Sequence, residues 1–408
     1  MITPSLRRWI FLCPVLAAFL AGPCPAQAGC TAFVMRGGGA LFLAKNLDWP
    51  VGEGLVCVNK KDVSKEAFGD GSFAPLRWTS KYGCVTFNQF GREFPLGGMN
   101  EEGLVIEELS ALADYPPPDG RPALNEFQWT QYHLDTCRSV KEVLKSAAGI
   151  RVARLLFGVH YLIADRKGNA AVVEFSKVRM VSYSGDSLPV AVLSNDTYEQ
   201  SLRNLSFHRG FGGERVVSSG PESGERFVRA AAALREYGSL GQRPILDQAF
   251  VILKSVAQED TQWSIAYSIP RRLVFFKTRD HRRYKIIPLE ALDFSCRLPA
   301  LILPVTTESA GNLLRDLVPY DPEENRRLLV SVFRALRDAG ELDEPFPDAT
   351  VQQMAAYPET CGCRKSASEK RVFNPRGYLE IPLASSPPPL GIRPNPVASG
   401  YRTSVRRK

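Results

Sequence analysis

The sequence predicts an α+β protein built on antiparallel sheets, and three observations support this fold class. Short segments rich in β-branched and aromatic residues, each bounded by turn residues, occur in three separate blocks. Two groups of helical patterns lie between these blocks, whereas a parallel α/β fold would alternate single strands with single helices. Hydrophobic residues make up 44% and charged residues 23% of the sequence, which is typical of a globular protein with a packed core.

The first segment, residues 1–28, has the layout of a secretory signal peptide. Two arginines precede an apolar run over residues 9–20, and the small-residue triplet Ala26-Gln27-Ala28 ends the segment. The apolar run is too short to span a bilayer. Cleavage after Ala28, followed by loss of Gly29, would make Cys30 the first residue of the mature chain.

A terminal cysteine carries a nucleophile and a base on one residue. The α-amine has a pKa of about 8 and the thiol of about 8.5, so the amine can accept the thiol proton near neutral pH. Two other readings of Cys30 stay open on this segment alone. Ala28-Gly29-Cys30 also suits a lipid-modified cysteine, although Gln27 stands where a large aliphatic residue is expected, and Cys30 could equally be a disulfide half or a buried thiol.

The residues after Cys30 predict a β-hairpin. Residues 30–35 and 40–44 have strand composition, and Gly37-Gly38-Gly39 predicts the turn between them. The second strand continues into Lys45-Asn46-Leu47-Asp48-Trp49. The hairpin brings Asp48 back to the start of the chain, where its carboxylate can orient the amine of Cys30.

The elements that follow are predicted in blocks. The capping box Ser139-Val140-Lys141-Glu142 marks one helix start, and Val140, Val143 and Leu144 form its apolar stripe. Strands are predicted over residues 54–59, 83–87, 159–165, 170–175, 190–193, 262–268, 272–277 and 284–287, and residues 97–109 are predicted as turn, strand, turn and strand. Helices are predicted over residues 125–137, 139–148, 224–237 and 245–256.

From Cys30 to Asp48 the chain resembles the choloylglycine hydrolase and penicillin V acylase family of N-terminal-nucleophile amidases. Members of that family open with Cys-Thr, a hairpin, and then a basic residue, Asn, an apolar residue and Asp. Lys45 departs from the arginine that is usual at the basic position, which keeps the charge but loses the two-pronged guanidinium geometry. The resemblance covers about residues 30–295 and implies a four-layer αββα sandwich of two antiparallel sheets flanked by helices.

The resemblance assigns roles to further residues. Residues 99–104, Met-Asn-Glu-Glu-Gly-Leu, match a family turn, and ten residues after its asparagine lies Ser110, whose N–H would serve the oxyanion hole. Asn195 at a strand end would be the second oxyanion donor, and Arg226 would point toward the nucleophile. The catalytic set implied is therefore Cys30, Asp48, Asn195, Arg226, Lys45 and Ser110. The loop over residues 111–120 would wall the acyl pocket, with Leu112 and Tyr115 as substrate-binding residues.

The implied activity is hydrolysis of a linear, non-peptide amide through a thioester on Cys30. Family substrates are penicillin V, N-acyl homoserine lactones and conjugated bile acids, and the partner expected is a small N-acyl amide. An acyltransferase on the same scaffold, and a non-enzymatic envelope lipoprotein lipidated at Cys30, are the alternatives. No cofactor and no metal is expected, because Cys361-Gly362-Cys363 lacks a second ligand pair. The resemblance also implies a homo-oligomer, a tetramer.

The formal net charge of +8 is confined to the C-terminal end. Residues 364–408 contain ten Lys and Arg against two Glu, so the rest of the chain sums to zero and offers no basic surface for a nucleic acid. We therefore expect a signal peptide with one pro-residue (1–29), a catalytic domain (30–345) and a basic, Pro-rich, disordered tail (346–408). The protein is expected to be exported, periplasmic or secreted, without stable membrane insertion after signal cleavage.

Overall fold

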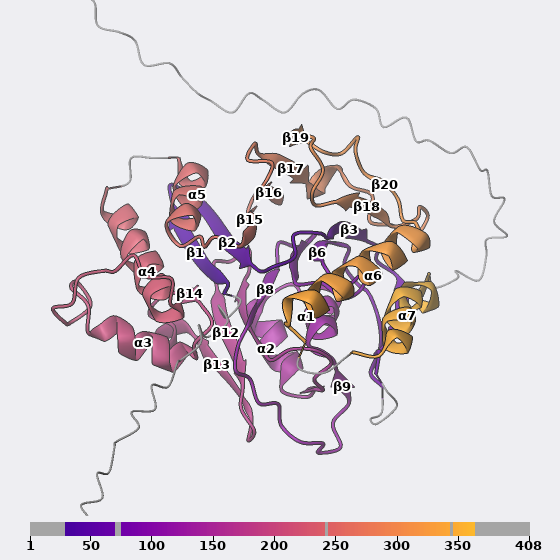
Figure 1. Ribbon diagram of the computed structural model, residues 1–408, viewed down its shortest axis with the longest axis horizontal. Coiled ribbons are helices and arrows are strands. Elements are labelled where there is room, and N and C mark those ends of the chain that lie inside the picture. The colour runs from indigo at the N-terminus through magenta and orange to yellow at the C-terminus, as the bar shows by residue number, and fades with distance from the viewer. Residues whose placement is uncertain (1–28, 70–74, 241–243, 343–345, 364–408) are drawn as a thin grey trace, which may run out of the picture. The chain divides into compact units, whose positions relative to one another are not determined.

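The computed structural model describes residues 29–69, 75–240, 244–342 and 346–363 (Figure 1). The predicted signal peptide and residues 364–408 of the predicted tail lie outside the described residues. Within the described residues, no helix is long and apolar enough to cross a membrane.

A seven-stranded sheet carries the N-terminal hairpin. All its neighbouring pairs are antiparallel except the last, which is parallel. Its strands, in spatial order, are β14 (Val192–Leu193), β1 (Thr31–Gly37), β2 (Ala40–Asp48), β15 (Thr261–Ser268), β16 (Leu273–Thr278), β17 (Lys285–Pro288) and β19 (Gly311–Asn312).

A nine-stranded antiparallel sheet forms the second layer. In spatial order it consists of β13 (Met180–Ser184), β12 (Ala170–Phe175), β11 (Val159–Ala164), β8 (Val105–Ser110), β7 (Gly97–Asn100), β6 (Cys84–Asn88), β3 (Leu55–Asn59), β18 (Leu301–Pro304) and β20 (Val318–Pro319). Two small sheets complete the strands: β9 (Ala123–Leu124) with β10 (Arg151–Val152), and β4 (Val63–Glu66) between β5 (Arg77–Thr79) and β21 (Gly362–Cys363).

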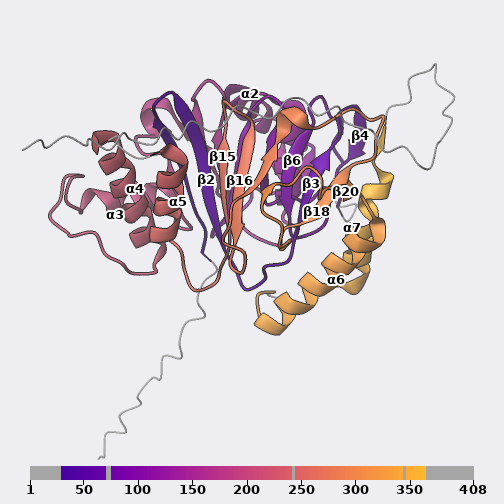
Figure 2. The ribbon, with the colours of Figure 1, turned by 90° about the horizontal axis from the view of Figure 1, so that it is seen from above.

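Helices cover the outer faces of the two large sheets. The α-helices are α1 (Glu126–Thr136), α2 (Val140–Ala147), α3 (Tyr198–Ser206), α4 (Ser223–Leu240), α5 (Ile245–Ser255), α6 (Pro322–Ala339) and α7 (Asp348–Ala356), with short 3-10 turns at Gly185–Ser187, Leu289–Ala291 and Tyr357–Thr360. Helices α4 and α5 contact β1 and β2, and α1 contacts β7 and β8. In Figure 2, α3, α4 and α5 lie beside β2, β15 and β16, and the second sheet follows on the far side.

The main core lies between the two sheets. Phe87 of β6 packs against Phe276 of β16 with ring centroids 5.2 Å apart and against Trp263 of β15 at 6.2 Å. A second core joins the other face of the nine-stranded sheet to α1 and α2, where Trp129 stacks on Tyr161. Because each sheet is apolar on both faces, helices must cover the outer ones. The predicted α+β class and the αββα sandwich are confirmed.

The N-terminal hairpin forms as predicted. Thr31 pairs with Asn46 and Gly37 with Ala40, so a two-residue loop joins the strands. Gly38 and Gly39 have φ values of 57° and 75°, a conformation that suits the strand twist and that glycine adopts without steric cost. The pairing carries Asp48, the last residue of β2, back beside Cys30.

The four predicted helices are present within a few residues of their expected bounds. Asn125 caps α1 by accepting from the Gln128 N–H, and Ser139 caps α2 by accepting from the Glu142 N–H. Helix α3 has no predicted counterpart. Its first turn is a capping box, with Thr197 and Gln200 bonded reciprocally, but its start directly follows the Asn195 turn, where a loop was expected.

The predicted start of the tail at residue 346 is wrong for its first part. Helix α7, the turn Tyr357–Thr360 and strand β21 are ordered on the body, and α7 packs on α6. The Cys296–Cys363 disulfide joins this segment to the end of the main body. The prediction rested on the proline content and basic charge of residues 364–408, and residues 346–363 do not share the basic charge. In α7, the buried residues Val351, Met354 and Ala355 supply apolar contacts instead.

Candidate active site

Cys30 lies directly before β1 and is 5% exposed. Ala32 pairs with Lys45, and side chains alternate along each strand, so Cys30 and Lys45 face the same space between the two sheets. Burial raises the pKa of the Cys30 thiol to about 11, and the positive charge of Lys45 is the largest opposing influence. The thiol is therefore protonated at neutral pH and needs a base to become a nucleophile.

The backbone nitrogen of Cys30 is held by a polar cluster. It donates to Asn195 Oδ1 at 2.9 Å, and the Cys30 carbonyl accepts from Arg226 Nη1 at 2.6 Å. In the described chain this nitrogen belongs to the Gly29–Cys30 peptide bond, and it stands in for the α-amine that cleavage would create. The surroundings of Gly29 are crowded, since an added Cβ would lie 2.3 Å from Gln258 Nε2 and 2.6 Å from Arg226 Nη2.

The Asn195 amide is oriented by partners on both ends. Its Oδ1 accepts from the Cys30 N–H and from Arg226 Nη2 at 2.7 Å, while its Nδ2 donates to the Ser110 carbonyl at 2.8 Å and to Ser110 Oγ at 3.0 Å. The turn around it is fixed by Ser223 Oγ, which accepts from the backbone N–H groups of Asn195 and Asp196. Ser110 thus positions Asn195, a role that its sequence position did not predict.

Arg226 connects the parts of the site. It lies in the first turn of α4, and it is 2% exposed. Beyond the Cys30 carbonyl and Asn195 Oδ1, its guanidinium donates to Thr31 Oγ1 at 2.7 Å and to the Pro221 carbonyl at 2.9 Å. These bonds use several donors of the planar fork, so Arg226 holds the first two residues of the domain in place.

Asp48 is buried at the end of β2. Its Oδ1 accepts from Thr261 Oγ1 at 2.5 Å, and its Oδ2 accepts from Gln258 Nε2 at 3.3 Å and lies 4.0 Å from Arg226 Nη1. Burial raises the pKa of Asp48 to about 7, against the opposing effects of the Thr261 hydrogen bond and the Arg226 charge. Because this carboxyl group titrates near neutral pH, its charge can change when the nearby Cys30 nitrogen gains or loses a proton.

The raised pKa of Asp48 predicts a pH-dependent stability. Between about pH 4 and pH 7 the folded chain retains a proton that the unfolded chain has released, so this carboxyl makes stability fall as pH rises. Asp48→Asn has no such proton. In a chain beginning at Gly29, we expect its free energy of unfolding relative to wild type to increase by about 2–4 kcal/mol from pH 4 to pH 7.5, measured by urea unfolding.

A chain beginning at Cys30 is the matched comparison. Its new ammonium group would lower the pKa of Asp48, so the same substitution should show a smaller pH dependence. A stability difference that does not change with pH in the Gly29 chain would contradict the raised pKa.

Lys45 belongs to a buried network that the sequence did not predict. Its Nζ lies 2.9 Å from Glu107 Oε2 of β8 and donates to the Leu96 carbonyl at 3.3 Å, and Tyr267 of β15 donates to Glu107 Oε1. Burial is the largest single influence and lowers the pKa of Lys45, but Glu107, Cys30 and Glu108 together raise it above its usual value. Gly97 makes room for this pair, since an added Cβ would lie 2.2 Å from Glu107 Oε2.

The charge of Lys45 should therefore have a measurable effect on the titration of the Cys30 thiol. Lys45→Met removes the largest influence that lowers the thiol pKa, so the midpoint of Cys30 alkylation by iodoacetamide should move to higher pH. Lys45→Arg should leave the midpoint nearly unchanged because the charge is kept. Peptide-resolved mass spectrometry distinguishes Cys30 from the other thiols, and Lys60→Met, at a buried lysine outside this network, is the control. An unmoved midpoint in Lys45→Met would show that Lys45 does not act on the thiol.

A cavity of about 490 Å³ adjoins this cluster. Ser110, Asn195 and Ser223 are among its polar lining residues, and Trp49 and Phe157 are among its apolar ones. The other polar residues of the lining are Arg154, Asp196, Thr197, Gln200 and Glu341. Leu112 borders the cavity and is 90% exposed, as expected of a wall residue at the mouth.

Tyr115 does not line this cavity, which corrects its predicted role. Its hydroxyl donates to the Phe157 carbonyl at 3.2 Å and accepts from the Val159 N–H at 3.0 Å, and its ring packs on Phe175 at 5.3 Å. Tyr115 therefore holds the wall segment at Phe157 from behind.

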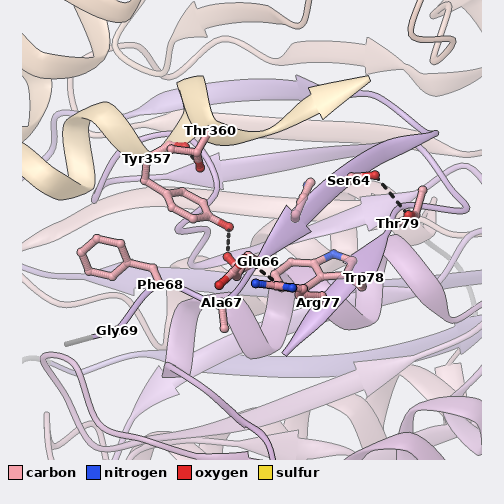
Figure 3. A pocket seen from close by; sticks show the side chains of 11 residues that line it. Ser64, Glu66, Ala67, Phe68, Gly69, Arg77, Trp78, Thr79, Tyr357 and Thr360 are labelled. Atoms are coloured by element: carbon pink, nitrogen blue, oxygen red, sulfur yellow. Dashed lines mark hydrogen bonds and ion pairs between the residues drawn. The ribbon is translucent and has the colours of Figure 1, made fainter. Parts of the chain in front are cut away.

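A second cavity, of about 820 Å³, lies between β4, β5 and the C-terminal turn (Figure 3). Figure 3 shows Tyr357, whose hydroxyl donates to the Glu66 carbonyl at 2.7 Å, and the Glu66–Arg77 ion pair at its edge. It shares no lining residue with the cavity beside Asn195. The larger cavity therefore plays no part in the cluster around Cys30.

The structure brings together Cys30, Asp48, Asn195, Arg226, Ser110 and Lys45, which come from four distant parts of the sequence. It adds Glu107, Gln258, Thr261 and Thr31, which sequence reasoning missed. Glu107 was detectable only as a charge in the apolar strand Val105–Ser110, an arrangement that usually needs a buried partner. No group of residues that could hold a metal ion occurs in the described part of the chain.

Comparison with known proteins agrees with this geometry. The family model for linear amide C-N hydrolases, choloylglycine hydrolase family, matches residues 30–301. A penicillin V acylase of Pectobacterium atrosepticum is 27% identical over 231 residues, which cover 50% of this chain and 61% of that relative. The match thus spans less than two thirds of the relative's length.

Two solved structures share the fold. Penicillin V acylase from Agrobacterium tumefaciens superposes with a TM-score of 0.63 at 24% identity, covering 72% of this chain and 98% of that one. A variant of conjugated bile acid hydrolase from Clostridium perfringens gives a TM-score of 0.56 at 15% identity, covering 69% and 98%. At these identities the superpositions support the fold alone.

Proposed function

The chain belongs to the choloylglycine hydrolase family of linear amide C-N hydrolases, and on that premise we propose that it is an N-terminal cysteine amidase that cleaves N-acyl amides through a thioester on Cys30. One observation carries this proposal. Asn195 and Arg226 converge on the backbone nitrogen and carbonyl of Cys30, with Asp48 beside them. Two side chains from distant elements thus fix both main-chain polar groups of Cys30, an arrangement that suits a residue whose nitrogen acts as a base.

The proposed reaction begins with proton transfer within Cys30. The α-amine takes the thiol proton, directly or through a water, and the thiolate attacks the amide carbonyl. The resulting oxyanion is stabilised by Asn195 Nδ2 and the Ser110 N–H. The ammonium then protonates the leaving amine as the C–N bond breaks, and water hydrolyses the remaining thioester to release the acid and restore the thiol.

The charges around Cys30 suit these reaction steps. Asn195 Oδ1 holds the nitrogen, and the opposite charges of Asp48 and Arg226 close to Cys30 limit the net electrostatic effect on the pKa of the amine. Lys45 lies on the thiol side and favours the thiolate. Glu107 pairs with Lys45, so the buried Lys45 ammonium is not left without a counter-charge.

The proposed substrate is an N-acyl amide whose acyl group enters the cavity beside Asn195. The family match and the relative named above as penicillin V acylase support an acyl amide, and N-acyl homoserine lactones share that chemistry. The lipoprotein alternative is disfavoured because Cys30 is 5% exposed, whereas a lipidated cysteine must reach the surface. Export to the periplasm or medium completes the proposal and rests on the sequence of residues 1–28.

Terminal sequencing combined with a substrate panel tests the proposal. Protein recovered after export should begin Cys-Thr-Ala-Phe and should hydrolyse at least one of penicillin V, N-decanoyl homoserine lactone and glycocholate. Active protein that still begins at Gly29 would exclude the amine as the base. A blocked, diacylated terminus would establish the lipoprotein alternative.

A further inference from the structure

The described residues that follow the family-matched range 30–301, namely 302–342 and 346–363, pack on the body of the domain. The Cys296–Cys363 disulfide fixes the far end of this segment. Near its middle, the Asn325 side chain of α6 accepts from the Arg92 N–H at 2.8 Å and donates to the Ala355 carbonyl of α7 at 3.1 Å. This C-terminal segment is therefore a packed part of the domain.

The residues that directly follow α6 lie at the cavity beside Asn195. Gly340 closes the helix in the left-handed conformation, with φ of 72°, and the Glu341 N–H donates back to the Leu336 carbonyl at 3.0 Å. Leu342 and Phe346 then line the same cavity as Ser110 and Asn195. Both side chains are partly exposed, so they present apolar surface to the cavity.

Aromatic contacts join Phe346 to the walls nearer Cys30. Its ring stacks on Phe333 of α6, with centroids 5.0 Å apart and planes at 13°. Phe333 contacts Phe90 at 5.8 Å, Phe90 contacts Phe157 at 5.7 Å, and Phe157 contacts Trp49 at 5.5 Å. Phe346 of the C-terminal segment is thus connected by packed aromatic rings to Phe157 and Trp49, which lie within the family-matched residues.

We propose that Leu342 and Phe346 are specificity-determining residues that contact the acyl group and favour amides with an extended apolar acyl chain. The inference rests on the proposed function, in that it takes the cavity beside Asn195 as the acyl site. A cavity of about 490 Å³ is large enough for such a group, and Leu112, Phe157, Leu342 and Phe346 are part of its apolar lining. The charged residues Arg154, Asp196 and Glu341 also line the cavity. Contacts remote from the reacting carbonyl change binding of the ground and transition states alike, so they should act mainly through KM.

Acyl-length discrimination is the property to measure. We expect Phe346→Ala and Leu342→Ala each to lower kcat/KM for an N-decanoyl amide by about 10-fold, mainly through KM, and to leave an N-butanoyl amide of the same amine within about twofold. Phe346→Trp keeps the stacking on Phe333 but narrows the cavity, so it should also penalise the decanoyl substrate. Phe207→Ala, at a half-exposed phenylalanine outside the cavity, is the matched control.

A binding measurement separates this inference from the proposed function. Calorimetric titration of the Cys30→Ala chain with the N-decanoyl amide should show binding that Phe346→Ala weakens by about 10-fold. If that holds while no variant hydrolyses any amide, the proposed function fails and the acyl site stands. Equal losses for both acyl lengths, an unchanged decanoyl preference, or no decanoyl binding to the Cys30→Ala chain would each overturn the inference. Thermal unfolding of every variant checks the fold.

Discussion

Cys30→Ser should lower kcat/KM for amide hydrolysis by at least about 10³-fold while the fold is retained. A hydroxyl is far harder to deprotonate than a thiol, and burial already raises the pKa of the Cys30 thiol to about 11. The substitution changes one side-chain atom, so both main-chain hydrogen bonds of residue 30 should persist. In these bonds the nitrogen donates to Asn195 and the carbonyl accepts from Arg226. Steady-state kinetics and circular dichroism measure the two properties.

The matched control is Cys137→Ser. Cys137 is 4% exposed and lies at the end of α1, away from the cavity. It should retain wild-type kcat/KM even if its stability falls slightly. Substantial activity in Cys30→Ser and Cys30→Ala together would leave Cys30 without a role as nucleophile.

Asn195→Ala should lower kcat by about 10²–10³-fold with a much smaller change in KM, as expected for loss of one oxyanion donor. The amide is oriented by Arg226 at its Oδ1 and by Ser110 at its Nδ2. The Nδ2 hydrogen that bonds Ser110 Oγ at 3.0 Å must turn to the substrate oxygen as charge develops there. Asn195→Asp keeps the acceptor for the Cys30 nitrogen but replaces the donor by a negative oxygen. We therefore expect it to be at least as damaging as the alanine.

The control for this series is Asn312→Ala, at an exposed asparagine of β19. It should be silent in kcat and KM. A rise in KM alone for Asn195→Ala would instead place Asn195 in substrate binding, and equal kcat in Asn195→Ala and wild type would contradict the oxyanion assignment.

Much of the fold was predictable because it depends on local sequence. Gly38 and Gly39 determine the tight turn of the first hairpin, and Asn125 and Ser139 mark two helix starts through their side-chain caps. The ordered segment after residue 346 was not predictable in this way. Its helix α7 is short, and its order depends on packing against α6 and on the Cys296–Cys363 disulfide, neither of which has a local signal.

The proposed chemistry of the site was predictable from the sequence. A cysteine after a signal-peptide pattern, followed by a hairpin that returns an aspartate, predicts a nucleophile, a base and an orienting carboxylate. Their surroundings were decided by the tertiary structure. Side-chain alternation along β2 places Lys45 on the opposite face from Asp48, where Glu107 of the other sheet pairs with it. Ser110 binds the Asn195 amide, Tyr115 packs inward, and Phe346 reaches the cavity through α6. Such pairings between sheets and between distant segments depend on how the layers pack, which no local pattern encodes.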